Sequence, residues 1–224
     1  MSKTYSMLSF AEENYLKAIY HLSEAGKRSV STNALSEEMK TKPASVSDMI
    51  KKLAEKDVIS YKKYQGVNIS ESGKREALKV VRKHRLWEVF LVEKLKFNWD
   101  EVHEIAEQLE HIKSPILTNK LDEFLGFPRI DPHGDPIPDE HGNFSNAPKY
   151  LLSEVEVGKQ VIVVGVENSE SSFLKHLDKI KISLGTKIVV KDKNEFDGLM
   201  EVQLAGNGQV PLTSKVAENL LVTE

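Results

Sequence analysis

The 224-residue sequence predicts an α+β protein that consists of an N-terminal winged helix, a helical middle part and a small C-terminal β-barrel. Apolar residues recur at helical spacing up to residue 56, at a two-residue period over residues 59–70, and again at helical spacing up to residue 125. Residues 126–149 contain five of the eight prolines, which marks the end of the helical part. After residue 150, short runs rich in valine and isoleucine alternate with turns, which is typical of a five-stranded barrel of about 70 residues.

The first 70 residues have the segment order of a winged helix-turn-helix. Helical spacing predicts a first helix over residues 8–25 and a short second helix over residues 33–39. Pro43 suits the first turn of a third helix, which continues to residue 56, because a backbone N–H has no helical partner at that position. Alternating polar and apolar residues over 59–70, around a Gln-Gly turn, then predict a hairpin.

The predicted third helix has one apolar face and one face of short polar and basic side chains. A recognition helix needs both, since one face anchors it to the protein and the other meets base edges and phosphates. The polar face carries Ser45, Ser47, Asp48, Lys51 and Lys52, and the hairpin adds Lys62 and Lys63. We therefore predict that these residues bind DNA. The alternatives are solvated side chains on a helical bundle, or a winged helix that binds protein.

Composition and charge fit this prediction and exclude other classes. The first 75 residues carry 13 Lys and Arg against 9 Asp and Glu, although the whole chain has a net charge of -3, so a basic first third suits a polyanion. The absence of cysteine excludes disulfides and thiolate metal ligands. Neither a signal peptide nor a run of 18 apolar residues is present, so we expect a cytoplasmic protein without a membrane partner.

Potential metal ligands gather on the helices predicted over residues 71–95 and 99–113. They are His84, Glu88, His103, Glu107, Glu110 and His111. At 100° per residue, those of each helix share one face, and imidazole with carboxylate suits Mn(II), Fe(II) or Zn(II). An ordinary surface helix also has a polar face opposite an apolar one, so the spacing alone leaves metal binding open.

Four segments carry a resemblance that covers essentially the whole chain. They are residues 13–20 (ENYLKAIY), 83–88 (KHRLWE), 103–111 (HEIAEQLEH) and 131–138 (DPHGDPIP). In this order they resemble the diphtheria toxin repressor family of metal-dependent repressors, which includes the manganese transport regulators.

The resemblance implies three domains and a repressor that is not an enzyme. Residues 1–75 would form the winged-helix DNA-binding domain, 76–145 a helical dimerisation and metal-binding domain, and 150–224 an SH3-like domain. The metal-loaded homodimer would bind a palindromic operator and repress metal-uptake genes. Two alternatives from other classes are a metal-dependent hydrolase, which would use His103 and Glu107 with the loop at 131–134, and a metal-binding adaptor.

The resemblance also implies the metal ligands. The primary site would consist of Asn14, Glu107, Glu110 and His111, the second site of His84, Glu88 and His103, and the loop would add Asp131 and His133. A carboxylate of the barrel, Glu167 or Glu170, is a further candidate. We expect the carboxylates to repel one another in the metal-free protein, so that a cation is needed to join the first helix to the dimerisation domain.

The ligand types indicate which metal is bound. Iron-sensing members of the family have Cys at the position of Glu107 and Met at the position of Asn14. Because oxygen and imidazole ligands suit Mn(II) better than sulfur does, Mn(II) is the predicted cofactor. Fe(II) is the alternative, and Zn(II) can bind in vitro. Asn14 is neutral where manganese regulators often have Asp, so the choice of metal depends most on this residue.

Overall fold

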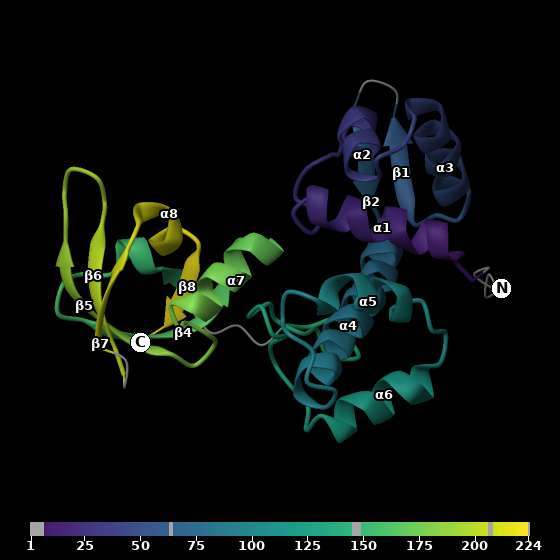
Figure 1. The fold of residues 1–224 in the computed structure, drawn as a ribbon. Helices are drawn as coiled ribbons and strands as arrows, with labels where there is room; N and C mark the ends of the chain where they lie inside the picture. The colour runs from purple at the N-terminus through teal and green to yellow at the C-terminus, as the bar shows by residue number, and fades with distance from the viewer. Residues whose placement is uncertain (1–6, 63–64, 145–148, 206–207, 224) are drawn as a thin grey trace. The chain divides into compact units, whose positions relative to one another are not determined.

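The computed structural model describes residues 7–62, 65–144, 149–205 and 208–223 (Figure 1). The chain forms two compact units. Unit 1 comprises Met1–His84, Leu109–Lys113 and Pro138–Asn143, and unit 2 comprises Arg85–Gln108, Ser114–Ile137 and Phe144–Glu224. The division falls within one continuous helix, α4 (Glu71–Glu93). Among the residues described, no helix has both the length and the apolar character needed to cross a membrane.

Unit 1 contains the winged helix that the sequence predicts. In chain order it consists of α1 (Phe10–Leu22), α2 (Thr32–Glu38), α3 (Pro43–Glu55), β1 (Ile59–Lys62), β2 (Gly66–Ile69) and the first part of α4. Its core is apolar and includes the buried side chains of Leu16, Ile19, Leu35, Ile50 and Leu53. The two strands pair antiparallel with Ile59 opposite Ile69.

The third helix is amphipathic, as the sequence predicts. Pro43 occupies its first turn, and Val46, Ile50 and Leu53 turn its apolar face towards the core of unit 1. The opposite face of α3 is therefore left to solvent.

Unit 2 begins with the remainder of α4, followed by α5 (Val102–Leu109) and α6 (Pro115–Phe124). The helix predicted over residues 99–113 is shorter than expected, because Glu110 and His111 form a turn and an extended segment leads to Pro115. Proline disfavours a helical conformation at the residue before it. A turn, rather than a shared helical face, therefore places Glu110 and His111.

The C-terminal part of unit 2 is a single antiparallel sheet with two short helices and one 3-10 turn. Its elements are β3 (Tyr150–Leu151), η1 (Leu152–Glu154), β4 (Gln160–Val166), α7 (Ser171–Lys179), β5 (Lys187–Lys193), β6 (Met200–Leu204), β7 (Gly208–Leu212), α8 (Ser214–Ala217) and β8 (Leu220–Thr223). The strand order is β3-β8-β4-β5-β6-β7, one strand more than the five predicted. The extra strand, β3, is two residues long and gives no detectable alternation. Helix α7 was not predicted from the sequence. Its buried side chains, Leu174 and Leu177, pack against the sheet.

Candidate metal centres

The predicted metal ligands gather in two clusters, one within each unit. The Glu110 cluster, in unit 1, consists of Glu13, Lys17, His84, Glu110 and His111. The Glu88 cluster, in unit 2, consists of Glu88, His103, Asp131 and His133. The sequence predicts three members of the first cluster and all four of the second.

Glu110 is the centre of the first cluster, and its side chain is fully buried. Lys17 on α1 donates from Nζ to both carboxylate oxygens, at 2.6 and 2.8 Å. His84 Nδ1 lies 2.6 Å from Glu110 Oε2. Burial by itself would raise the pKa of Glu110, but the hydrogen bond from His84 and the charge of Lys17 hold that pKa below its usual value. Glu110 is therefore an ionised carboxylate with two internal partners.

His111 joins the turn after α5 to helix α1 through a second carboxylate. Its Nδ1 lies 2.6 Å from Glu13 Oε2, and its Nε2 lies 3.8 Å from Glu110 Oε1. The ring of Phe10 stacks on the imidazole with 4.7 Å between the ring centroids. Two segments that are far apart in the sequence thus bring two carboxylates and an imidazole together.

Sequence reasoning assigned Asn14 to this cluster, whereas the structure places its neighbour Glu13 against His111. Glu13 lies three residues before the buried Leu16, so a carboxylate on the apolar face of α1 was a signal that could have found it. The sequence held no comparable signal for Lys17, because a lysine on a helix is usually solvated.

Asn14 and Glu107 stay predictions as metal ligands. Asn14 is half-buried on α1. Glu107 belongs to unit 2, where its Oε1 lies 3.6 Å from His103 Nε2, and its side chain is 52% exposed.

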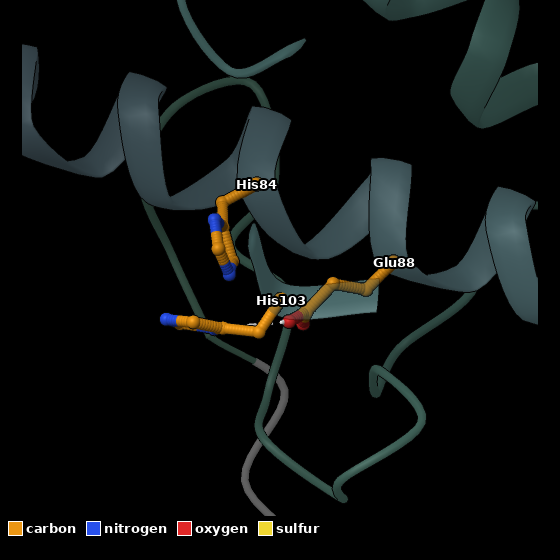
Figure 2. Close-up of side chains that lie close together, drawn as sticks. All are labelled: His84, Glu88 and His103. Atoms are coloured by element: carbon orange, nitrogen blue, oxygen red, sulfur yellow. Dashed lines mark ion pairs between the residues drawn. The ribbon is translucent and has the colours of Figure 1, made fainter. Parts of the chain in front are cut away.

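Figure 2 shows the three residues predicted for the second site. His84 and Glu88 leave α4 one helical turn apart on the same side, and the His103 ring of α5 lies beside the Glu88 carboxylate, with 3.4 Å between Nδ1 and Oε1. His84 belongs to unit 1, whereas Glu88 and His103 belong to unit 2. The potential ligand atoms of these three residues lie within 4.8 Å of one another.

The predicted loop at 131–134 meets the same carboxylate. His133 Nδ1 lies 3.6 Å from Glu88 Oε2, and the potential ligand atoms of Glu88, Asp131 and His133 also lie within 4.8 Å of one another. The other ring nitrogen, Nε2, lies 2.9 Å from the carbonyl oxygen of Trp99, whose indole stacks on the imidazole. Since a carbonyl can only accept, Nε2 carries the proton and Nδ1 is left to face Glu88.

Asp131 is buried, and its charge is poorly balanced. Its Oδ1 accepts the backbone N–H groups of His133 (2.8 Å) and Asp135 (3.0 Å), and Arg85 Nε lies 3.5 Å from Oδ2. Burial and the nearby carboxylates of Glu88 and Asp135 nevertheless raise the pKa of Asp131 to about 7. Burial would lower the pKa of His133, but hydrogen bonding to Glu88 and the neighbouring negative charges raise it to about 9.

A glycine allows the loop to pack against strand β4. Gly134 has φ +88°, and a Cβ at this position would lie 2.0 Å from the carbonyl oxygen of Val164 and 2.1 Å from the Cα of Gly165. The backbone N–H of Val166 also donates to the carbonyl oxygen of His133, at 2.9 Å. The sheet therefore holds the loop, and with it two of the candidate ligands, in place.

Both clusters hold donors that suit a divalent cation, but among the described residues the groups whose ligand atoms lie within 4.8 Å of one another include Glu88 and not Glu110. Each cluster combines carboxylates with imidazoles, the donors that Mn(II), Fe(II) and Zn(II) accept. In the Glu88 cluster, burial and the neighbouring carboxylates raise the pKa of Asp131, and a cation would favour its ionised form. A bound cation would supply a centre of positive charge to which donors from several elements attach at once.

The candidate DNA-binding residues lie as the sequence predicts. Ser45, Ser47, Asp48, Lys51, Lys52 and Lys62 are all exposed, on α3 and at the end of β1. Lys63 lies outside the described residues. Asp48 and Lys51 form an exposed ion pair of 3.3 Å, which water and salt weaken, so both side chains remain available to a ligand.

The two candidate carboxylates of the C-terminal domain are exposed. Glu167 follows β4, and Glu170 precedes α7. Among the described residues, the groups whose ligand atoms lie within 4.8 Å of one another do not include either carboxylate.

A winged helix followed by buried clusters of carboxylates and imidazoles defines a metal-responsive DNA-binding regulator. Residues 7–67 match the N-terminal DNA binding domain of the iron dependent repressors, residues 70–139 match their metal binding and dimerisation domain, and residues 150–224 match the FeoA domain. The chain belongs to the iron-dependent repressor family, which includes the diphtheria toxin repressor, and is a metal-dependent transcriptional repressor. The resemblance stated from the sequence is confirmed, as is the SH3-like C-terminal domain.

Solved structures of similar sequence extend over nearly the whole chain. A manganese-dependent transcriptional repressor in complex with manganese is 36% identical, with a TM-score of 0.80 over 95% of this chain and 99% of its own. ScaR with bound Zn²⁺ is 29% identical, with a TM-score of 0.71 over 95% of this chain and 99% of its own.

Curated relatives match smaller parts. The iron-dependent repressor IdeR of Mycobacterium leprae is 29% identical over 68% of this chain and 69% of its own length. An uncharacterized HTH-type transcriptional regulator of Methanocaldococcus jannaschii is 33% identical over 53% of this chain and 94% of its own length. A probable metal transport system membrane protein of Chlamydia trachomatis is 41% identical over 86 residues, which are 38% of this chain and 19% of that protein.

Proposed function

We propose that this protein is a Mn(II)-responsive repressor of metal-uptake genes, which acts as a homodimer on palindromic operator DNA in the cytoplasm. The observation that carries the proposal is the Glu110 cluster, in which α1 of the winged helix meets Glu110 and His111. A cation held by these two residues together with Glu13 or Asn14 favours one arrangement of α1 and of α3, which packs on it. Such a preference for one conformation is all that metal-dependent activation requires.

The exposed face of α3 supports the DNA part of the proposal. Short hydroxyl and basic side chains there suit contacts with base edges and phosphates, and Lys62 of the hairpin suits the neighbouring backbone. In a twofold dimer, two such helices would read the two halves of a palindrome.

Apolar side chains in and after α6 support a homodimer. Ile116 is 77% exposed, Phe124 64% and Phe127 60%, and Leu117 is also exposed. Exposed large apolar side chains are common at interaction sites, and these four lie within residues 116–127. This segment lies within residues 70–139, which match a dimerisation domain.

The donor chemistry supports Mn(II) over Fe(II). The carboxylate and imidazole donors lack the sulfur ligands that favour softer ions. Fe(II) is the alternative, since IdeR of Mycobacterium leprae is an iron-dependent repressor, whereas the repressor most similar in structure among those named above was solved with manganese. Zn(II) also accepts imidazole and carboxylate donors and can bind in vitro, and ScaR was solved with bound Zn²⁺.

The proposed repressor has three domains and two metal sites. The domains are residues 1–75, 76–145 and 150–224. The primary site uses Asn14 or Glu13 with Glu107, Glu110 and His111. The second site uses His84, Glu88 and His103 with Asp131 and His133 of the loop. The ligand atoms of Glu88, Asp131 and His133, all in unit 2, lie within 4.8 Å of one another, which supports it.

Operator binding under controlled metal tests the proposal. Fluorescence anisotropy with labelled promoter DNA is measured without oxygen in chelator, Mn(II) and Fe(II), and Mn(II) is expected to tighten binding most. Glu110→Ala should reduce the metal-dependent increase in operator affinity by at least about 100-fold. Glu104→Ala, an exposed change on α5, is the matched control and should leave the gain intact.

Three results would contradict parts of the proposal. If operator affinity is the same in chelator, Mn(II) and Fe(II), metal does not control DNA binding. If Glu110→Ala shows the full metal-dependent increase in operator affinity, Glu110 is not a ligand of the activating metal. A larger gain with Fe(II) than with Mn(II) selects the iron-responsive alternative.

A further inference from the structure

Lys17 is a cation at the centre of a cluster of candidate metal ligands. Its ammonium contacts both oxygens of Glu110, at 2.6 and 2.8 Å, and its side chain is 16% exposed while that of Glu110 is fully buried. Two elements thus hold the ion pair: α1 carries the lysine, and the turn after α5 carries the carboxylate.

The ammonium and a divalent cation need the same carboxylate. Glu110 already accepts a hydrogen bond from His84 at Oε2 (2.6 Å), and His111 lies 3.8 Å from Oε1. A metal ion on Glu110 would stand a few ångströms from the Lys17 ammonium. In a buried place, where water screens little, the repulsion between a dication and an ammonium at that distance is large.

We propose that Lys17 is an internal competitor of the metal: it neutralises Glu110 in the metal-free protein, and metal binding is an exchange in which the ammonium leaves Glu110 for solvent. This inference rests on the proposed function. The partly exposed side chain gives the ammonium a path to water, because the flexible stem of a lysine can turn without movement of α1.

The exchange affects the metal concentration to which the repressor responds. Since the ion pair must be broken before Glu110 can bind a metal ion, Lys17 raises the metal concentration at which the repressor responds. Lys17 also ties α1 to Glu110 when no metal is present, so the metal replaces one link between these segments by another.

Direct measurement of Mn(II) binding tests the exchange without recourse to DNA. Electron paramagnetic resonance of free Mn(II) counts the bound ions in the full-length chain. All proteins carry Glu88→Gln, which removes the carboxylate common to both groups of candidate ligands in the second site, so that the titration reports the Glu110 cluster. The variants on this background are Lys17→Gln, which keeps an N–H donor without the charge, and Lys17→Arg, which keeps the charge.

Lys56 provides the matched control. It also pairs with a buried glutamate of α1, Glu12, at 2.8 Å, and its side chain is 24% exposed, but neither residue is a candidate ligand. Lys56→Gln therefore removes the same kind of ion pair from the same helix.

Lys17→Gln is expected to bind Mn(II) at least about tenfold more tightly than the background protein, whereas Lys17→Arg and Lys56→Gln stay within about twofold. Equal or weaker binding by Lys17→Gln overturns the inference and makes Lys17 a residue that orients Glu110 for the metal. If the background protein and wild type bind no Mn(II), the proposed function fails as well. Thermal unfolding in chelator shows whether each variant is folded, and Lys17→Met repeats the measurement should Lys17→Gln not fold.

Discussion

In the Glu110 cluster, each buried carboxylate has a basic partner: Lys17 and His84 contact Glu110, and His111 contacts Glu13. In the Glu88 cluster, Glu88 and Asp131 also have basic neighbours, His133 and Arg85, but burial and the repulsion between the two carboxylates still raise the pKa of Asp131 to about 7. The two clusters therefore use the same donor types but balance their charge differently.

The difference shows two ways to keep carboxylates buried before a metal binds. One uses an internal cation, and the other uses a proton. We expected the carboxylates to repel one another in the metal-free protein. This is wrong for the Glu110 cluster, because Lys17 neutralises Glu110. In the Glu88 cluster the carboxylates do repel one another. A metal ion would displace an ammonium at the first cluster and protons at the second.

The largest predicted effect is a difference in pH dependence between the clusters. With the pKa of Asp131 at about 7 and that of His133 at about 9, both groups lose a proton when a metal binds the Glu88 cluster near neutral pH. Its Mn(II) affinity should rise by up to about 100-fold per pH unit below pH 7 and about tenfold per unit from pH 7 to 9. The lowered pKa of Glu110 leaves that carboxylate no proton to release in this range.

Mn(II) titrations at pH 6 to 9 check this difference, with Glu110→Gln reporting the Glu88 cluster and Glu88→Gln reporting the Glu110 cluster. Parallel slopes in the two variants would contradict the distinction.

The stability of the metal-free protein should fall over the same pH range. The folded pKa of His133 lies above its unfolded value, so the stability it contributes is complete below about pH 6.5 and is lost as pH rises through 9. The folded pKa of Asp131 is also raised, so its ionisation destabilises the fold as pH rises from about 4 to 7. Melting temperatures in chelator should therefore decrease from pH 6 to 9, and less steeply in Asp131→Asn.

Neutralising one carboxylate in each cluster should change stability in opposite directions. In metal-free protein at pH 8, Glu110→Gln removes the ion pair with Lys17, whose ammonium can turn to solvent, and should cost about 2 kcal/mol. Asp131→Asn removes an unfavourable charge but keeps an oxygen that accepts the same two backbone N–H groups, and should stabilise by about 1 kcal/mol. Calorimetric unfolding in chelator measures both changes, and equal signs would refute the comparison.

The position of the 131–134 loop can be tested at Gly134. Gly134→Ala places a Cβ against the backbone of β4 and should cost about 3 kcal/mol, with loss of Mn(II) binding at the Glu88 cluster alone. Gly126→Ala is the control, since Gly126 also has a positive φ but no atom lies within 4 Å of its added Cβ. That change should cost about 1 kcal/mol and leave metal binding intact. Equal losses in the two variants would mean that close packing does not fix the loop.

The smallest predicted effect concerns Trp99. Its indole Nε1 donates to Asp178 at 3.2 Å, and its backbone carbonyl accepts from His133. Trp99→Phe keeps the carbonyl and the stacked ring, so it should cost about 1 kcal/mol of stability and change Mn(II) affinity of the Glu88 cluster by less than about twofold. A larger loss of affinity would show that the indole, rather than the carbonyl, positions His133.

Much of the fold was predictable because local sequence determines it. Pro43 begins α3, and the alternation around the Gln-Gly turn gives the β1–β2 hairpin. The helix over residues 99–113 was predicted too long because apolar residues at helical spacing continue to Ile112, whereas the helix ends at Leu109 and is followed by a turn. Helix α7 was missed because it contains few apolar residues and depends on the sheet for its burial.

The sequence by itself determined which donors the protein has: carboxylates and imidazoles without cysteine, on helices and in one loop. The tertiary structure alone decided how these donors group and what balances their charge. It placed Glu13 rather than Asn14 against His111, brought Lys17 onto Glu110 across 93 residues, and set His133 beside Glu88. The physical reason is that helical spacing fixes neighbours within one turn, whereas the charge state of a buried group depends on partners that only folding brings near.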